Sequence, residues 1–98
     1  MYIKIYYDNP YEWHNPYIYV YDAASTKCDV SEAAPWPGEQ LVKEGRWYTY
    51  KKTNCRTAKV IFNNNYGGQD PGPGQKGYEV EGEMWYYKGQ WYSENPIE

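Results

Sequence analysis

The segment PYIYVYD, residues Pro16 to Asp22, has a tyrosine at every second position and a branched aliphatic residue between neighbouring tyrosines. Successive side chains of a β-strand point to opposite faces, so Ile18 and Val20 are expected on one face and the phenol rings on the other. The three rings are those of Tyr17, Tyr19 and Tyr21. Spaced about 6.6 to 7 Å apart, they form a flat strip that is either covered by a second sheet or open to solvent.

The same period of two recurs along the chain, with frequent Gly, Pro and Asn between the alternating segments, and no window has a helical apolar stripe. The sequence therefore predicts an all-β protein. The predicted strands are Tyr2–Tyr7, Tyr17–Asp22, Gln40–Lys43, Trp47–Lys51, Lys59–Asn63, Tyr78–Val80, Met84–Tyr87 and Gln90–Tyr92. Short spacings and hairpin turns at Gly45 and at Lys88-Gly89 favour a small antiparallel β-sandwich, immunoglobulin-like, as a single domain over residues 1–98.

Three longer connections are predicted, at Asp8–Pro16, Ala23–Gly38 and Asn63–Gly77. The third contains NNNYGGQDPGPGQKG, which is too rich in Gly, Pro and Asn to be a regular element. Long loops held by rigid strands are common places for binding groups.

Charge and hydropathy exclude several classes of partner. A net charge of -3 opposes a phosphate-binding surface, so we expect no nucleic acid. The chain has no run of about 18 apolar residues and no signal-peptide stretch at its start, so we expect a soluble module of a larger protein, with an added initiator Met and no membrane contact.

Cys28 and Cys55 are interpreted either as one disulfide, worth about 3 kcal/mol, or as two free thiols.

Aromatic residues make up 20% of the chain, with fourteen Tyr and five Trp against eleven Ile, Val and Leu residues. A core of this size cannot hide all of these rings, so some are expected on the surface. Trp36 is a candidate because Pro35 and Pro37 stiffen the loop that carries it. The same position also suits a structural plug.

Flat exposed rings suit a pyranose, whose axial C–H groups stack on aromatic faces while its hydroxyls need hydrogen bonds. Stacking on each ring is worth about 1 to 3 kcal/mol by analogy with nucleic acid bases. The loop NNNYGGQD supplies polar partners, namely Asn64, Asn65, Gln69 and Asp70. Gln69 is the best single candidate because a carboxamide both donates and accepts.

The ordered set YIYVYD, WPG and VIFNN followed by GGQ resembles a starch-binding carbohydrate-binding module of family 26, close to family 25, over nearly the whole chain. This resemblance implies a β-sandwich that binds α-1,4-glucans such as amylose, amylopectin and maltooligosaccharides without catalysis or cofactor. It implies a monomeric appendage of a secreted or cell-surface bacterial amylase or starch-adherence protein.

By motif, the resemblance assigns ligand binding to Tyr17, Tyr19, Trp36 and Gln69. Tyr21, His14 and Asn65 are further possible ligand contacts. The chain departs from the simpler family pattern in an enlarged segment around Cys28 and in DPGPGQKG after Gln69. The helical curve of an α-glucan suits rings set at an angle to one another, whereas flat cellulose suits a coplanar row.

The same sequence also bears on other functions. Glu79, Glu81 and Glu83 alternate and so are predicted to share a face, either as a glycosidase pair or as charges that protect an edge strand. The only histidine, His14, has no nucleophile context, so a catalytic triad is not predicted. No calcium-loop spacing connects the aspartates, so no metal site is predicted. A module that binds a peptide or a neighbouring domain is the alternative function.

Overall fold

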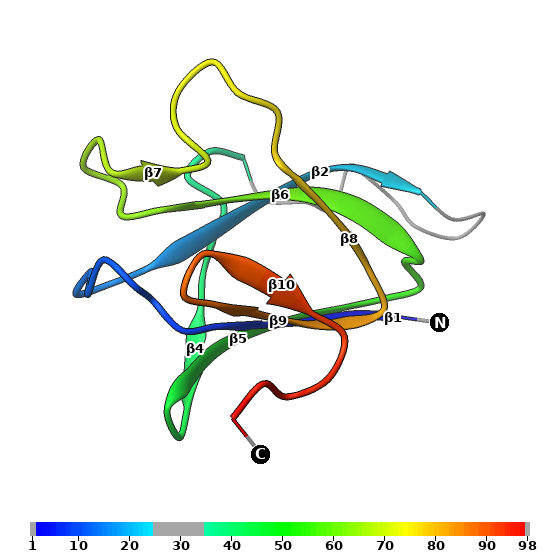
Figure 1. Ribbon diagram of the computed structural model, residues 1–98. Coiled ribbons are helices and arrows are strands. Elements are labelled where there is room, and N and C mark those ends of the chain that lie inside the picture. Colours follow the sequence, from blue (N-terminus) through cyan, green and yellow to red (C-terminus); the bar gives the residue numbers. More distant parts are fainter. Residues whose placement is uncertain (1, 25–34, 98) are drawn as a thin grey trace.

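The computed structural model describes residues 2–24 and 35–97, which form two β-sheets packed face to face (Figure 1). The first, here called the β1 sheet, runs in the order β10 (Gln90–Tyr92), β9 (Glu83–Tyr87), β1 (Tyr2–Tyr7), β5 (Trp47–Thr53) and β4 (Val42–Glu44). The second, the β2 sheet, runs in the order β3 (Glu39–Gln40), β2 (Tyr17–Ala24), β6 (Thr57–Asn63) and β7 (Gln69–Asp70), and β8 (Tyr78–Glu81) also pairs with β6. The predicted β-sandwich is confirmed.

The strand pairings among the described residues are antiparallel except for β1 with β9, which run parallel. The chain returns to β9 from β8 in the opposite sheet, and Gly82 adopts a φ of 65° at this crossing. Because β8 and β9 lie in different sheets, β9 reaches its place beside β1 without a hairpin to that strand.

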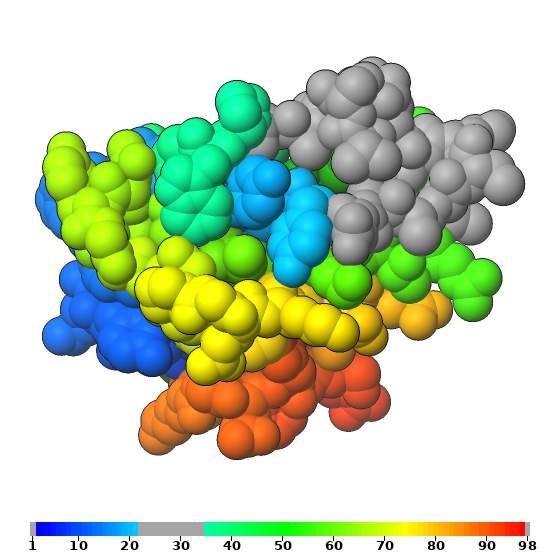
Figure 2. Space-filling model, turned by 90° about the horizontal axis from the view of Figure 1, so that it is seen from above, coloured from blue at the N-terminus to red at the C-terminus, as the bar shows by residue number. Residues whose placement is uncertain are grey.

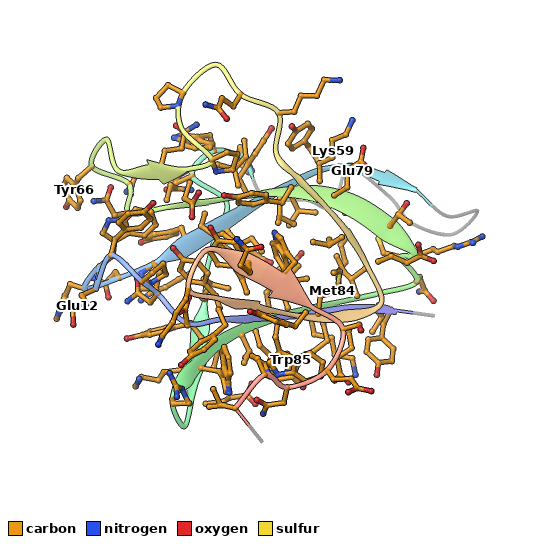
Figure 3. The ribbon with its side chains drawn as sticks, viewed as in Figure 1. Glu12, Lys59, Tyr66, Glu79, Met84 and Trp85 are labelled. Atoms are coloured by element: carbon orange, nitrogen blue, oxygen red, sulfur yellow. The ribbon has the colours of Figure 1, made fainter. Side chains whose placement is uncertain are left out.

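The core lies between the sheets and follows the alternation of the sequence. The inward residues of β1, β2 and β6 are buried, and they are Ile3, Ile5, Tyr7, Ile18, Val20, Val60 and Phe62. Tyr7 and Phe62 stack with ring centroids 3.8 Å apart. Alternation is also visible in β9, where Met84 lies between the sheets and Trp85 lies on the outer side (Figure 3). Aromatic rings therefore fill much of the core, as their abundance predicted.

One predicted strand is wrong. Gln40–Lys43 is not a single strand, because the chain leaves the β2 sheet after β3 and enters the β1 sheet at β4. Leu41, between them, is buried, and its N–H donates to the carbonyl of Pro16. The short strand β7 was also missed, because it lies inside a segment whose composition predicted a loop.

The prediction that Glu79, Glu81 and Glu83 share one face is also wrong. Glu79 and Glu81 belong to β8 of the β2 sheet, whereas Glu83 belongs to β9 of the β1 sheet. Glu83 accepts a hydrogen bond from the Tyr6 hydroxyl at 2.8 Å. The turn at Gly82 separates residues that a continuous strand would have aligned.

Cys55 is fully buried and is disulfide-bonded. Cys28, the other cysteine of the sequence, lies outside the described residues. The free-thiol alternative is therefore wrong for Cys55.

No helix long and apolar enough to cross a membrane occurs within residues 2–24 and 35–97.

Candidate functional site

The tyrosine strip of β2 lies on the outer face of the β2 sheet and is not covered by the β1 sheet. Ile18 and Val20 are buried, whereas Tyr17, Tyr19 and Tyr21 are each half-buried. Figure 2 looks onto this face, where light-blue atoms of β2 lie between the teal segment after residue 35 and the yellow loop before β8. Of the two alternatives for the tyrosine strip, covered by a second sheet or open to solvent, the structure therefore shows the second.

Trp36 lies beside Tyr19 and is 49% exposed, so it does not act as a buried plug. The two ring centroids are 5.3 Å apart and the ring planes meet at 61°. On the other side of Tyr19, Tyr21 stacks with a centroid distance of 5.7 Å and an interplanar angle of 26°. We call Tyr17, Tyr19, Tyr21 and Trp36 the aromatic platform.

The loop that carries Trp36 rests directly on β2, and this close approach requires glycine at position 38. A Cβ on Gly38 would lie 2.0 Å from the carbonyl oxygen of Ile18, and Gly38 has a φ of +93°. The Gly38 N–H donates to the carbonyl of Pro35 at 2.7 Å. The motif WPG is therefore explained by packing: the glycine lets the turn lie flat on the strand and so places Trp36 against Tyr19.

Asn63, which the sequence did not single out as a site residue, connects two loops beneath the platform. Its side chain is fully buried, donates to the carbonyl of Pro37 at 3.0 Å, and accepts from the Asn65 N–H at 3.0 Å. Asn65 itself is exposed, with a left-handed φ of 62°. The Trp36 loop and the β6–β7 loop are thus held by one carboxamide. The sequence signal that could have identified it is an Asn at the end of an apolar strand, directly before a Gly-rich loop.

Gln69 is brought to the same face as the platform by strand register. Asn63 pairs with Tyr17 on one side and with Gln69 on the other, so all three side chains lie on the outer side of the β2 sheet, where Asn63 is buried by its contacts with Pro37 and Asn65. Two strand spacings separate Tyr17 from Gln69, which is about 10 Å. Gln69 is half-buried.

The next residue, Asp70, points inward and fixes this end of β7. It is buried, and its carboxylate accepts hydrogen bonds from the hydroxyls of Tyr78 and Tyr86. Asp70 is therefore used in packing rather than as a polar partner on the outer face. No group of three or more His, Cys, Asp or Glu suited to a metal ion occurs in the described part of the chain.

Tyr21 has a second role in holding the loop before β8. Its hydroxyl oxygen accepts a hydrogen bond from the Gly77 N–H at 2.7 Å. The Lys59 ammonium lies 6.0 Å from the centroid of the Tyr21 ring. Because its hydroxyl oxygen accepts the hydrogen bond from Gly77 and its ring stacks on Tyr19, Tyr21 is held in place beside Tyr19.

His14 is exposed on the Asp8–Pro16 loop, where it lines a hollow with Trp13.

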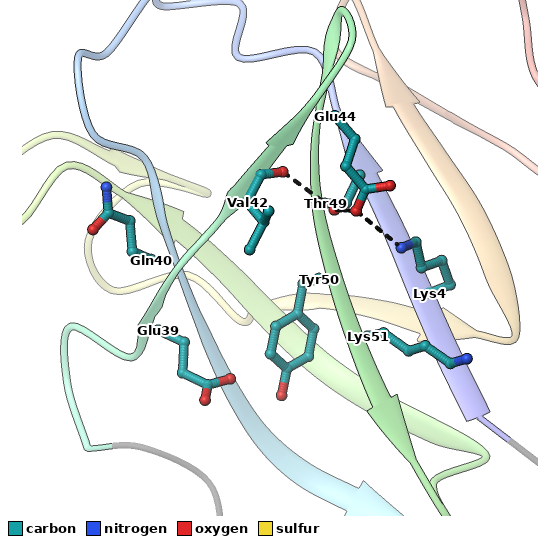
Figure 4. Close-up of a pocket in the computed structure, with 8 residues that line it drawn as sticks. All are labelled: Lys4, Glu39, Gln40, Val42, Glu44, Thr49, Tyr50 and Lys51. Carbon is teal, nitrogen blue, oxygen red and sulfur yellow. Dashed lines mark hydrogen bonds and ion pairs between the residues drawn. The ribbon is translucent and has the colours of Figure 1, made fainter.

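Another hollow, of about 300 Å³, opens at the β4 edge of the β1 sheet (Figure 4). Glu44 in it accepts from the Thr49 hydroxyl at 2.5 Å and pairs with Lys4 at 3.4 Å, and these contacts lower the pKa of the Glu44 carboxyl. None of the predicted site residues lines this charged hollow.

The hydrogen bonds to Asp70 are expected to make the folded state less stable at alkaline pH. Burial and the hydrogen bond to Asp70 raise the pKa of Tyr78 from 10.0 to about 12. The folded state then holds the proton more tightly than the unfolded state, so the stability from Tyr78 is complete below about pH 10 and is lost as pH rises to about 12. We expect urea denaturation across this range to show a falling free energy of unfolding, with a shallower fall in Tyr78→Phe.

The exposed Tyr92→Phe variant is the control for this experiment and should retain the wild-type pH profile. An equally steep fall in Tyr78→Phe would contradict the assignment. Tyr6, whose pKa is also raised to about 12 by burial and by Glu83, accounts for part of the fall that remains.

A small β-sandwich with angled aromatic rings on the outer face of one sheet suits a carbohydrate-binding module. Comparison with protein families gives a match over residues 5–75 to the starch-binding module 26 model. The chain belongs to this family. A comparison with curated proteins found no match.

Solved structures support the assignment. The family 26 module of a Bacillus halodurans amylase in complex with maltose is 28% identical, with a TM-score of 0.79 over 96% of this chain and 99% of that one. A second structure of that module gives a TM-score of 0.78 at 28% identity over 96% and 93% of the chains. The iodinated family 25 module from a Bacillus halodurans amylase, in complex with maltotetraose, shares the fold, with a TM-score of 0.69 and 23% identity over 98% and 99%.

Proposed function

We propose that this chain binds α-1,4-glucans such as starch and maltooligosaccharides on the aromatic platform, without transforming them. The observation that carries the proposal is the pair formed by half-buried Tyr19 and exposed Trp36, whose ring planes meet at 61°. The maltose complex of the similar Bacillus halodurans module supports the same ligand class.

The two ring planes suit the shape of an α-linked chain. Successive glucose units of an α-1,4-glucan turn relative to one another, so one unit stacks on Tyr19 while its neighbour stacks on Trp36. A β-1,4-linked chain is flat and presents parallel faces, which cannot lie on both planes at once. The angle between the rings therefore selects the linkage, while the rings supply the apolar contact.

Polar contacts orient the sugar on the rings. Gln69, on the outer face beside the Tyr17 end of the platform, donates to one hydroxyl and accepts from the next. Tyr17 offers a further phenol at this end. Each hydrogen bond replaces one that the sugar made with water, so its net contribution is small, about 1 kcal/mol. We expect an affinity on the order of 10 μM to 1 mM, typical of a shallow site.

In this proposal the chain is a monomeric, cofactor-free appendage of a larger extracellular protein, secreted or held at a bacterial cell surface. Sister modules in that protein would raise the avidity of individually weak sites.

Calorimetry with maltoheptaose, cellohexaose and chitohexaose tests the function. We expect binding heat with maltoheptaose and none with the two β-linked oligomers, because only the α-linked chain follows the angle between the rings. Heat with cellohexaose of equal size, or no heat with any sugar, would contradict the proposal, and the latter would favour a surface for a peptide or neighbouring domain. Release of sugars from starch would contradict the non-catalytic role.

A further inference from the structure

A second group of exposed rings lies at the end of the sandwich, outside the aromatic platform. Tyr66 is 91% exposed and Tyr11 is 59% exposed. They come from two loops, between β6 and β7 and between β1 and β2, and Figure 3 shows Tyr66 and Glu12 at the same end of the molecule. Between these loops is a hollow of about 320 Å³, here called the end hollow, lined by Trp13, His14, Asn15, Asn64 and Tyr66.

The β1–β2 side of the end hollow is anchored to the core. The Asn9 side chain is buried, donates to the Trp13 carbonyl at 2.8 Å and accepts from the Trp13 N–H at 3.1 Å. The Trp13 ring lies against buried Tyr7, with centroids 6.4 Å apart, and Tyr11 stacks on Trp13 at 5.3 Å. Tyr11 and Trp13 therefore form a preorganised aromatic surface that needs little ordering when a ligand binds.

The β6–β7 side is equally well defined. The side-chain oxygen of Asn64 accepts hydrogen bonds from the N–H groups of Tyr66 and Gly68, both at 2.8 Å. The Asn64 N–H in turn donates to the Gly68 carbonyl at 3.1 Å. This closed turn fixes the backbone of Tyr66 and leaves its ring in solvent, where no intramolecular packing explains a large aromatic residue.

The chemistry of the lining indicates a neutral ligand with many hydroxyls. Indole and phenol faces stand beside the side chains of two asparagines and one histidine, and the lining contains no carboxylate, Lys or Arg. Such a set suits a pyranose, which stacks through its C–H face and bonds through its edge. The volume is near the lower limit of pockets that hold small molecules.

The end hollow also borders the platform. Asn15 accepts a hydrogen bond from Gln40 at 3.1 Å, and Gln40 pairs with Tyr17. On the other side, Asn64 directly follows Asn63, which also pairs with Tyr17. A glucan chain that passes the Tyr17 end of the platform therefore arrives between the two loops.

We propose that the end hollow, with Tyr66 in its lining and Tyr11 beside it on Trp13, is a second contact for the same α-glucan, reached by chains too long for the platform alone. This inference rests on the proposed function and adds a dependence on chain length. Short oligosaccharides use only the platform, whereas longer ones gain additional stacking at the end of the sandwich.

Calorimetry of Tyr66→Ala with maltotriose and with maltoheptaose tests the inference. We expect maltotriose affinity to stay within about twofold of wild type and maltoheptaose affinity to fall by at least about fivefold, since one stacked ring is worth at least about 1 kcal/mol. Tyr11→Ala should show the same selectivity for chain length. Because both side chains are exposed, both variants are expected to fold normally, so a loss of binding would not reflect misfolding.

Tyr92→Ala is the matched control, since Tyr92 is also exposed but belongs to β10 of the opposite sheet. It should bind both sugars as wild type does. Wild-type binding of both sugars by Tyr66→Ala would overturn the second contact, and so would an equal loss with both. A failure of the proposed function gives a different result: if the platform is not the main site, Trp36→Ala will bind maltotriose as wild type does.

Discussion

Replacing Trp36 with alanine is expected to weaken maltoheptaose binding by at least about thirtyfold, or about 2 kcal/mol. The substitution removes one of the two ring planes that meet at 61°, leaving Tyr19 to hold a single sugar face. Because Trp36 is 49% exposed, its removal leaves little cavity in the core, and the fold should be retained. Native affinity electrophoresis in amylopectin gels and calorimetry measure the effect.

Circular dichroism separates the two ways in which this prediction can fail. Unchanged retardation of Trp36→Ala in amylopectin would show that the binding site lies elsewhere. Loss of the β-type spectrum would show that the indole is needed for folding. Tyr92→Ala, which removes an exposed ring from β10, should retain both the spectrum and the retardation of wild type.

Gly38→Ala is expected to abolish most binding without altering any residue proposed to touch the sugar. The new Cβ would lie 2.0 Å from the Ile18 carbonyl oxygen, so the turn must lift from β2 and carry Trp36 away from Tyr19. We expect at least about tenfold weaker maltoheptaose binding and a loss of about 1 to 3 kcal/mol in the free energy of unfolding. Calorimetry and urea denaturation measure the two effects.

Gly89→Ala provides a matched control for the backbone strain. Gly89 has a φ of +80°, but a Cβ there would meet nothing within 4 Å, and it lies between β9 and β10 of the opposite sheet. Its substitution should lower stability while maltoheptaose affinity stays at the wild-type value. Full affinity in Gly38→Ala would show that the position of Trp36 does not depend on this close approach.

The predictions for Trp36 and Gly38 address separate parts of one arrangement. The rings provide stacking energy, while Gly38 and Asn63 determine where the Trp36 ring lies. An aromatic ring misplaced by a small movement loses the contact as surely as one that is deleted, because stacking requires close approach to the sugar face. The precision of the site therefore depends on side chains and backbone that the ligand does not touch.

Strand alternation was sufficient to predict much of the fold and the tyrosine strip. Side chains on a strand alternate between faces whatever the rest of the chain does, so the aliphatic residues Ile18 and Val20 had to lie opposite Tyr17, Tyr19 and Tyr21. The same logic failed at Leu41 and Gly82, where the chain changes sheets. Local pattern contains no information about which sheet a short strand joins, since that choice depends on pairing with distant strands.

The candidate site was likewise predicted only in part, because some of its residues act through contacts with distant parts of the chain. Sequence motifs singled out Trp36 and Gln69, but Asn63 was missed because its role depends on the carbonyl of Pro37, twenty-six residues away. Asp70 was interpreted as a loop polar group, yet β7 turns it inward to Tyr78 and Tyr86. Gln69 and Asp70 are adjacent, but their side chains point to opposite faces of the sheet because the two residues form the short strand β7.

The sequence by itself determined the alternating faces, the excess of rings over the capacity of a small core, and the stiffness of the Pro35–Pro37 loop. Only the tertiary structure decided that the strip faces solvent, that Trp36 meets Tyr19 at an angle, and that Tyr66 and Tyr11 stand at one end of the sandwich. The physical reason is that alternation is a property of each strand, whereas exposure and the angle between rings depend on how separate strands and loops pack.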